Sequence, residues 1–155
     1  MRRKDREVLE SARIEAIVRS ACVCRIALCD GDMPYVVPVN YGYEDGTLYV
    51  HSAREGRKID LIRKNGNVCF EVESGVELVP GKTRSGCTMK YASVIGCGKA
   101  VLVDDPQEKK RGLEIILRQH AVDRYEMPEE LVNRTLLIRI RIDSITGKAS
   151  GEPGA

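Results

Sequence analysis

One eight-residue segment combines residue types that could bind an anion. It runs His51-Ser-Ala-Arg-Glu-Gly-Arg-Lys58 and lies where a strand pattern gives way to a helix pattern. A helix N-terminus offers unpaired N–H groups and a partial positive charge, which suit a phosphate. Arg57 and Lys58 add two cations, and an arginine can bind phosphate in a forked geometry. The alternative interpretation is a solvated helix start whose charges face water.

A second segment, Pro34-Tyr-Val-Val-Pro-Val-Asn40, predicts an edge strand or a bulge. Apolar residues alternate along it, but Pro38 cannot donate a hydrogen bond to a β ladder. An edge strand leaves backbone N–H and C=O groups unpaired. A planar heterocycle such as a flavin could bind them, because its pyrimidine ring carries donors and acceptors in one plane. An edge strand without a ligand is the alternative.

Single polar side chains elsewhere are weaker candidates. Ser93 could donate a hydrogen bond to a polar ligand, and nearby Gly96 and Gly98 could mark close backbone approach; a bent barrel strand is the alternative. His51 could be a polar contact beside a redox centre or a proton donor. His120 lies on the apolar face of a predicted helix, so we expect it to be a packed boundary residue.

Composition limits the class of protein. The chain has 155 residues, a net charge of +2 and 43% hydrophobic residues, which fits one soluble domain over residues 1–155. The charge is too balanced to predict nucleic-acid binding. No apolar run approaches the ~20 residues of a membrane span, so a cytoplasmic location is the default expectation. We expect flexible ends at about residues 1–5 and 149–155.

The cysteines do not predict a metal or disulfide site. Six are present, without a C-x-x-C pair and with only two histidines. Cys22 and Cys24 are expected to share one face of a strand as small buried hydrophobes.

The periodicities predict a mainly β fold, an antiparallel β-barrel with peripheral helices. Strands are expected over 22–29, 33–43 and 47–51 as a meander, then over 68–72, 88–103 and 136–142. A bulge or bend is expected near Gly96-Cys97-Gly98. Helices are expected over 6–20, after a capping box of Ser52 and Glu55, and over 106–121, with a helical turn over 129–133. A long loop is expected over 74–87.

Taken in order, these segments resemble a known family. The resemblance rests on the segments Pro34–Asn40, Leu48-Tyr-Val-His-Ser52, Gly56-Arg-Lys58, Val68-Cys-Phe-Glu71 and Tyr91-Ala-Ser-Val-Ile-Gly96 with Gly98. They are similar to pyridoxamine 5′-phosphate oxidase-like proteins of the nitroimidazole-reductase type, over about residues 5–148. The C-terminal segment lacks the substrate-binding Arg/His pattern of genuine pyridoxamine-phosphate oxidases, which argues against vitamin B6 oxidation.

The resemblance implies an FMN-binding split β-barrel that forms a homodimer, with FMN at the interface. It implies that the strand over 35–39 contacts the flavin ring through its backbone, that His51–Ala53 lies beside the cofactor, and that two cations hold its phosphate. The implied cofactor contacts are Tyr35, Val36, Val37, Pro38, Val39, His51, Ser52, Ala53, Arg57, Lys58 and Ser93, with His51 as the candidate catalytic residue.

The function implied is an FMN-dependent oxidoreductase. It would pass electrons from NAD(P)H to a small, nitroaromatic-type acceptor, with the cofactor supplying the redox chemistry. Two alternatives stay open. One is a flavin-binding or redox-sensing protein that is not an enzyme, and the other is a split barrel that holds haem or another flavin.

Overall fold

The computed structural model describes residues 2–81, 86–122 and 127–151. Strands dominate it, and helices lie outside the sheet. The elements in chain order are η1 (Lys4–Arg6), β1 (Glu7–Val8), α1 (Ser11–Ser20), β2 (Cys24–Asp30), β3 (Met33–Val39), β4 (Gly42–Glu44), β5 (Thr47–Ser52), α2 (Arg57–Lys64), β6 (Asn67–Val79), β7 (Thr88–Val103), α3 (Pro106–Gln119), α4 (Glu129–Arg134) and β8 (Leu136–Ser150).

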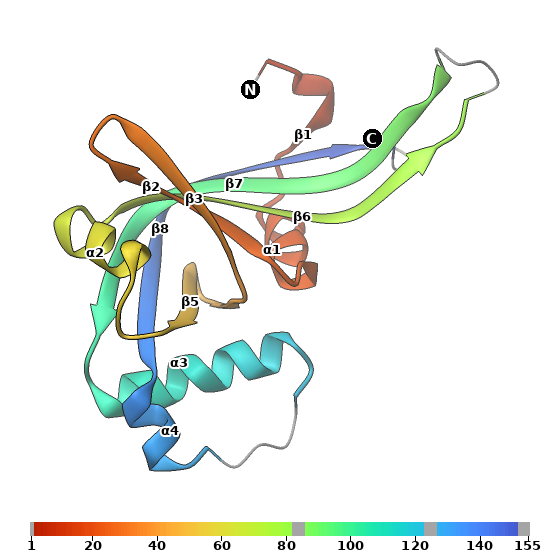
Figure 1. The fold of residues 1–155 in the computed structure, drawn as a ribbon. Coiled ribbons are helices and arrows are strands. Elements are labelled where there is room, and N and C mark those ends of the chain that lie inside the picture. The colour runs from red at the N-terminus through yellow and green to blue at the C-terminus, as the bar shows by residue number, and fades with distance from the viewer. Residues whose placement is uncertain (1, 82–85, 123–126, 152–155) are drawn as a thin grey trace.

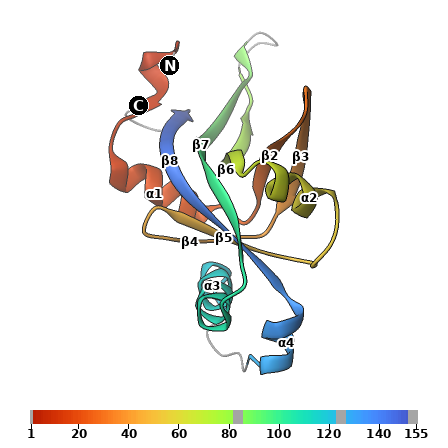
Figure 2. The same cartoon turned by 90° about the vertical axis from the view of Figure 1, so that its left-hand side faces the viewer.

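The strands form one antiparallel sheet in the order β3-β2-β6-β7-β8-β5-β4, and β1 pairs with β8. The sheet twists strongly, with α2 at one side and α3 and α4 beneath β5 (Figures 1 and 2). This is a split-barrel fold, so the predicted mainly β class with peripheral helices is confirmed. None of the helices in the described ranges combines the length and apolar character needed to cross a membrane.

Alternation along the strands builds the core. In β2 the side chains of Cys24, Ile26 and Leu28 are buried, whereas Arg25 between them is exposed. Such period-2 burial is typical of a sheet with one covered face. The inward residues of β6, β7 and β8 join them, and Ile14, Ile17 and Val18 of α1 complete the same cluster. Cys22 precedes β2 and is exposed, so the expectation that it is buried beside Cys24 is wrong.

The predicted meander is only partly correct. Residues 33–43 form two strands, because the chain bends at Asn40 and Tyr41. β3 pairs with β2, while β4 pairs with β5, and β3 and β4 lie at opposite ends of the strand order. The buried hydroxyl of Tyr41 donates a hydrogen bond to the carbonyl of Val18, which holds this bend against α1. Asp45 and Gly46, both with positive φ, form the predicted hairpin turn.

Helix α3 packs closely against the sheet. Asp105 is its N-cap, and the Asp105 carboxylate accepts a hydrogen bond from the Glu108 amide. A Cβ added to Gly42 of β4 would lie 2.6 Å from the backbone of Ile115 and Ile116, so only glycine allows this approach. At the C-terminal end, the Gln119 side-chain amide donates to the carbonyls of Val18, Arg19 and Ala21. These contacts fix α3 beside β4 and β5.

Strands β6 and β7 extend beyond the sheet as a hairpin arm, which projects away from the other elements (Figure 1). The predicted loop over 74–87 is therefore wrong for residues 74–79, and residues 82–85 lie outside the described ranges. Gly75 has a φ of +62°, and a register shift lies between Ser74 and Glu77. The glycine thus forms a bulge, after which the ladder continues.

The last strand is longer than predicted. β8 continues beyond the predicted 136–142 to Ser150, and Ala149 and Ser150 are buried. β8 pairs with β7 on both sides of a register shift between Cys97 and Gly98. This irregularity confirms the bulge or bend predicted there.

Candidate functional site

His51 lies near the end of β5, opposite Leu137 of β8. Its side chain is exposed on one side, but the surrounding protein lowers its pKa from the ordinary 6.5, and the charges of Lys58 and His120 lower it further. His51 is therefore neutral at neutral pH. A neutral imidazole offers one hydrogen-bond donor and one acceptor.

The chain then crosses from β5 to α2 through residues 53–56. Helix α2 begins at Arg57, and Gly56, with a φ of +125°, is its N-cap. The predicted capping box is wrong, because the helix starts five residues after Ser52 and its first turn receives no side-chain cap. The glycine carbonyl accepts from the amides of Ile59 and Asp60. The amides of Arg57 and Lys58 at this helix N-terminus remain available to an anion.

Arg57 joins α2 to the β2–β3 hairpin. Its guanidinium donates to the Asp30 carboxylate at 2.8 and 3.2 Å, and it lies 4.8 Å from the centre of the Tyr35 ring. The structure thus brings two predicted site residues, Arg57 and Tyr35, into contact. The ion pair is exposed, so breaking it costs little.

Lys58 differs from Arg57 in its surroundings. Its side chain is half-buried, and loss of water lowers the pKa of its ammonium group. No carboxylate lies within ion-pair distance of Lys58 in the described part of the chain. A partly desolvated cation without a counter-charge is costly to the protein alone, and a bound anion would offset that cost.

Strand β3 is an edge strand, as its prolines predicted. It pairs with β2 only within the described ranges. Tyr35, Val37 and Val39 are directed toward the core side, while Val36 is 57% exposed and Pro38 is also exposed. The free edge of β3 therefore presents backbone donors and acceptors near Arg57.

Ser93 does not join these residues within one chain. Ser93 of β7 pairs with Glu73 of β6 and Lys148 of β8. His51 of β5 pairs with Leu137 of β8, and Leu137 in turn pairs with Val103 of β7. Ten residues of β7 separate the two positions, which is roughly 30 Å along a strand. No described contact joins Ser93 to His51 within one chain.

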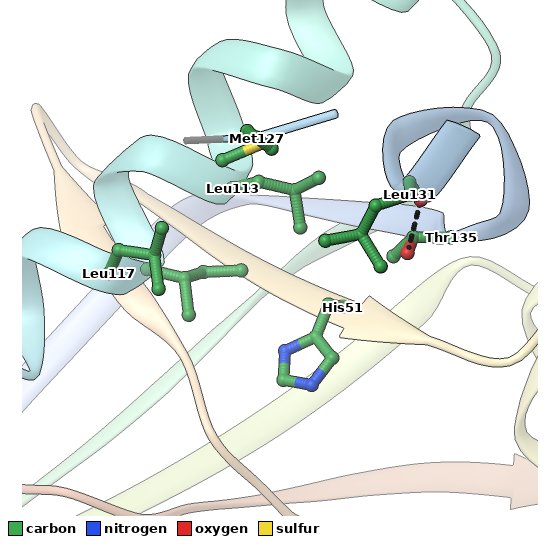
Figure 3. A pocket seen from close by; sticks show the side chains of 7 residues that line it. His51, Leu113, Leu117, Met127, Leu131 and Thr135 are labelled. Carbon is green, nitrogen blue, oxygen red and sulfur yellow. Dashed lines mark hydrogen bonds between the residues drawn. The ribbon is translucent and has the colours of Figure 1, made fainter. Parts of the chain in front are cut away.

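A cavity of about 250 Å³ adjoins His51 (Figure 3). Apart from His51 its lining is mostly apolar and comes from α3, α4 and the residues beside α4. The lining residues are His51, Leu113, Ile116, Leu117, Met127, Leu131 and Thr135. Leu113, Leu117 and Leu131 gather on one side of His51. The sequence showed Leu113, Ile116 and Leu117 only as a helical apolar face, which core packing explains equally well.

His120 lies beside this region at the end of α3. It is half-buried, as expected for a boundary residue, and its Nε2 atom is buried without a hydrogen-bond partner in the described part of the chain. Its charge acts on His51, so the two imidazoles are close enough to interact electrostatically.

Comparison with known proteins identifies relatives of this fold. A crystal structure from Bacteroides thetaiotaomicron, of a protein provisionally assigned to 5-nitroimidazole antibiotic resistance, shares 34% identity over 92% of this chain and 86% of that chain, with a TM-score of 0.83. A curated protein of Rhizobium meliloti is 32% identical over 65 residues, so the match spans less than half of either chain.

More distant structures share the fold. The flavocytochrome Anf3 from Azotobacter vinelandii has a TM-score of 0.83 at 17% identity, covering 99% of this chain and 73% of that one. A FAD-binding protein from Mesorhizobium loti has a TM-score of 0.67 at 23% identity, covering 92% and 96%. Residues 10–149 match the family described as pyridoxamine 5′-phosphate oxidase. The chain therefore belongs to the pyridoxamine 5′-phosphate oxidase-like family.

Proposed function

We propose that this chain is an FMN-binding flavoprotein that acts as a homodimeric oxidoreductase, passing electrons from NAD(P)H to a small nitroaromatic-type acceptor. The observation that carries the proposal is Lys58, a half-buried cation at the N-terminus of α2, which has no side-chain cap; among the described residues no carboxylate pairs with Lys58. This corner offers both a positive charge and free amides to a phosphate.

The residues around the N-terminus of α2 suit the ring system of the flavin. Arg57 forms an exposed ion pair with Asp30, and its guanidinium can leave this carboxylate to bind the phosphate instead. The free edge of β3 lies beside it and offers backbone hydrogen bonds to the ring system. His51, in its neutral form, can hydrogen-bond to a ring atom. Ser52 and Ala53 follow it in the segment that leads to the helix.

Two features support a homodimer with the cofactor at the interface. Ser93 lies roughly 30 Å along β7 from the register of His51, and a second copy of the chain could bring it to the site. The hairpin arm also exposes Val76, Leu78 and Met89, at 53%, 60% and 42%. Large apolar side chains grouped on an exposed hairpin are typical of a surface that another protein covers.

The cavity beside His51 suits a small apolar acceptor. Its volume of about 250 Å³ and its leucine-rich lining favour an aromatic ring over a charged metabolite. The Bacteroides relative, at 34% identity, is provisionally linked to 5-nitroimidazole resistance, which supports a nitroaromatic class of acceptor. Bound FMN would supply the hydride and electron transfer, while the chain positions the acceptor and excludes water.

The test begins with the purified protein and its absorption spectrum. Titration with FMN, FAD and haem should give tightest binding for FMN, and NADH or NADPH should bleach the bound flavin under anaerobic conditions. Turnover with nitroaromatics and quinones then defines the acceptor. Tight FMN binding without bleaching would leave a non-enzymatic flavin-binding protein, and preferential haem binding would overturn the proposal.

A further inference from the structure

Two cysteines face each other across the centre of the sheet. Cys69 of β6 and Cys97 of β7 are direct register partners in an antiparallel pair. Facing residues in such a pair have Cα atoms about 4.5–5.5 Å apart. A disulfide spans Cα distances of about 4.4–6.8 Å. The backbone therefore already holds these two residues at a separation that a disulfide can bridge.

Both thiols lie on the outer face of the sheet. Their neighbours Val68 and Phe70 are buried in the core, whereas Cys69 is half-exposed and Cys97 is exposed. Partial burial raises the pKa of the Cys69 thiol, and the neighbouring Cys97 side chain raises it further. Cys97 is thus the member of the pair that a solute reaches first.

No other cysteine in the described ranges has such a partner. Cys24 is buried opposite Val39 and Val72, and Cys29 faces Pro34. Cys29 is diagonal to Cys69, because Cys69 faces Ala27. Diagonal neighbours are about 7–8 Å apart, which is beyond the reach of a disulfide without backbone movement.

We propose that Cys69 and Cys97 form a reversible thiol-modification site, a cross-strand dithiol that small disulfides of the glutathione class oxidise to a disulfide. The Cys97 thiol loses its proton and attacks the small disulfide, whose S–S bond breaks and releases one thiol. The Cys69 thiol then loses its proton and attacks the mixed disulfide at the Cys97 sulfur, releasing the second small thiol. The protein loses two protons and two electrons, and the small disulfide gains both.

The position of this pair gives its oxidation a structural effect. The two residues lie in the part of the β6–β7 ladder that β2 and β8 flank, next to the register shift between Cys97 and Gly98 in the pairing of β7 with β8. Phe70 packs directly over Gly96 on the inner face of the same ladder. A bond between residues 69 and 97 encloses the arm in a covalent loop, so it restricts the unfolded chain and raises stability.

The experiment treats the full-length native protein with oxidised glutathione, alkylates the remaining thiols and digests without reduction. Mass spectrometry should find a peptide that links residues 69 and 97 as the main disulfide, within one chain. The melting temperature should rise by several degrees and return after dithiothreitol treatment. Cys97→Ser and, as a second variant, Cys69→Ser should each abolish both effects, whereas the control Cys22→Ser should keep them.

Two results would overturn the proposal. In one, Cys69 and Cys97 are both still alkylated after exposed Cys22 has formed a mixed disulfide with glutathione. In the other, Cys97 is linked to a different cysteine or to a second copy of the chain.

Discussion

Lys58 is the side chain whose removal should separate binding of the phosphate from binding of the flavin ring. Replacing it with alanine deletes one charge-assisted hydrogen bond to the phosphate, and such a bond contributes ~1.5–3 kcal/mol. The dissociation constant for FMN should rise about 10- to 150-fold. Riboflavin carries the same ring without the phosphate, so its affinity should not change. Arg57→Ala should cost less than about tenfold, because Arg57 first gives up its ion pair with Asp30.

The assay is quenching of flavin fluorescence, titrated in parallel with FMN and riboflavin. Lys64→Ala is a matched control, since Lys64 is an exposed lysine in the last turn of the same helix. The melting temperature of the Lys58→Ala protein should be equal to or above that of the parent, because a half-buried unpaired cation is lost. Equal losses for FMN and riboflavin, or no loss for either, would refute the placement of the phosphate at α2.

Three further substitutions test neighbouring parts of the account. Asp30→Asn should tighten FMN binding several-fold in the same titration, because Arg57 loses its competing carboxylate; weaker binding would contradict this. The pKa of His51 is lowered in the folded state, so the free energy of unfolding should fall as the pH drops below 6.5. His51→Gln should make this free energy less dependent on pH in urea unfolding between pH 7 and 5. An unchanged pH dependence would exclude His51 as its source. Gly42→Ala, with its Cβ 2.6 Å from the α3 backbone, should cost ~1–3 kcal/mol or more of unfolding free energy. Gly31→Ala, with φ +60° and open space, should cost only ~1 kcal/mol; equal costs in denaturant unfolding would contradict the close contact.

The helices and strands that the sequence predicted correctly have a clear hydrophobic period or a proline that marks a boundary. Pro106 with Asp105 marked the start of α3, and Pro38 marked β3 as an edge strand. The arm was missed because Gly75 and Pro80 suggested a loop. A glycine bulge lets a ladder continue, and only the pairing partner reveals that it does.

The candidate site was partly predictable for a similar reason. The change from strand to helix pattern after His51 predicted the connection that leads into α2, although not the residue at which α2 begins. The contact between Arg57 and Tyr35 joins residues 22 positions apart, and no local pattern encodes it. The cavity depends on α3 and α4 packing over β5. A helical apolar face reports burial, but it does not distinguish a filled core from a lined cavity.

The most direct test of the central claim is a crystal structure of the protein with FMN. We expect the phosphate at the N-terminus of α2, within hydrogen-bond distance of the Lys58 ammonium group and the first amides of that helix, with the ring along the free edge of β3. A phosphate bound elsewhere, with this corner empty or closed by the protein's own side chains, would contradict it.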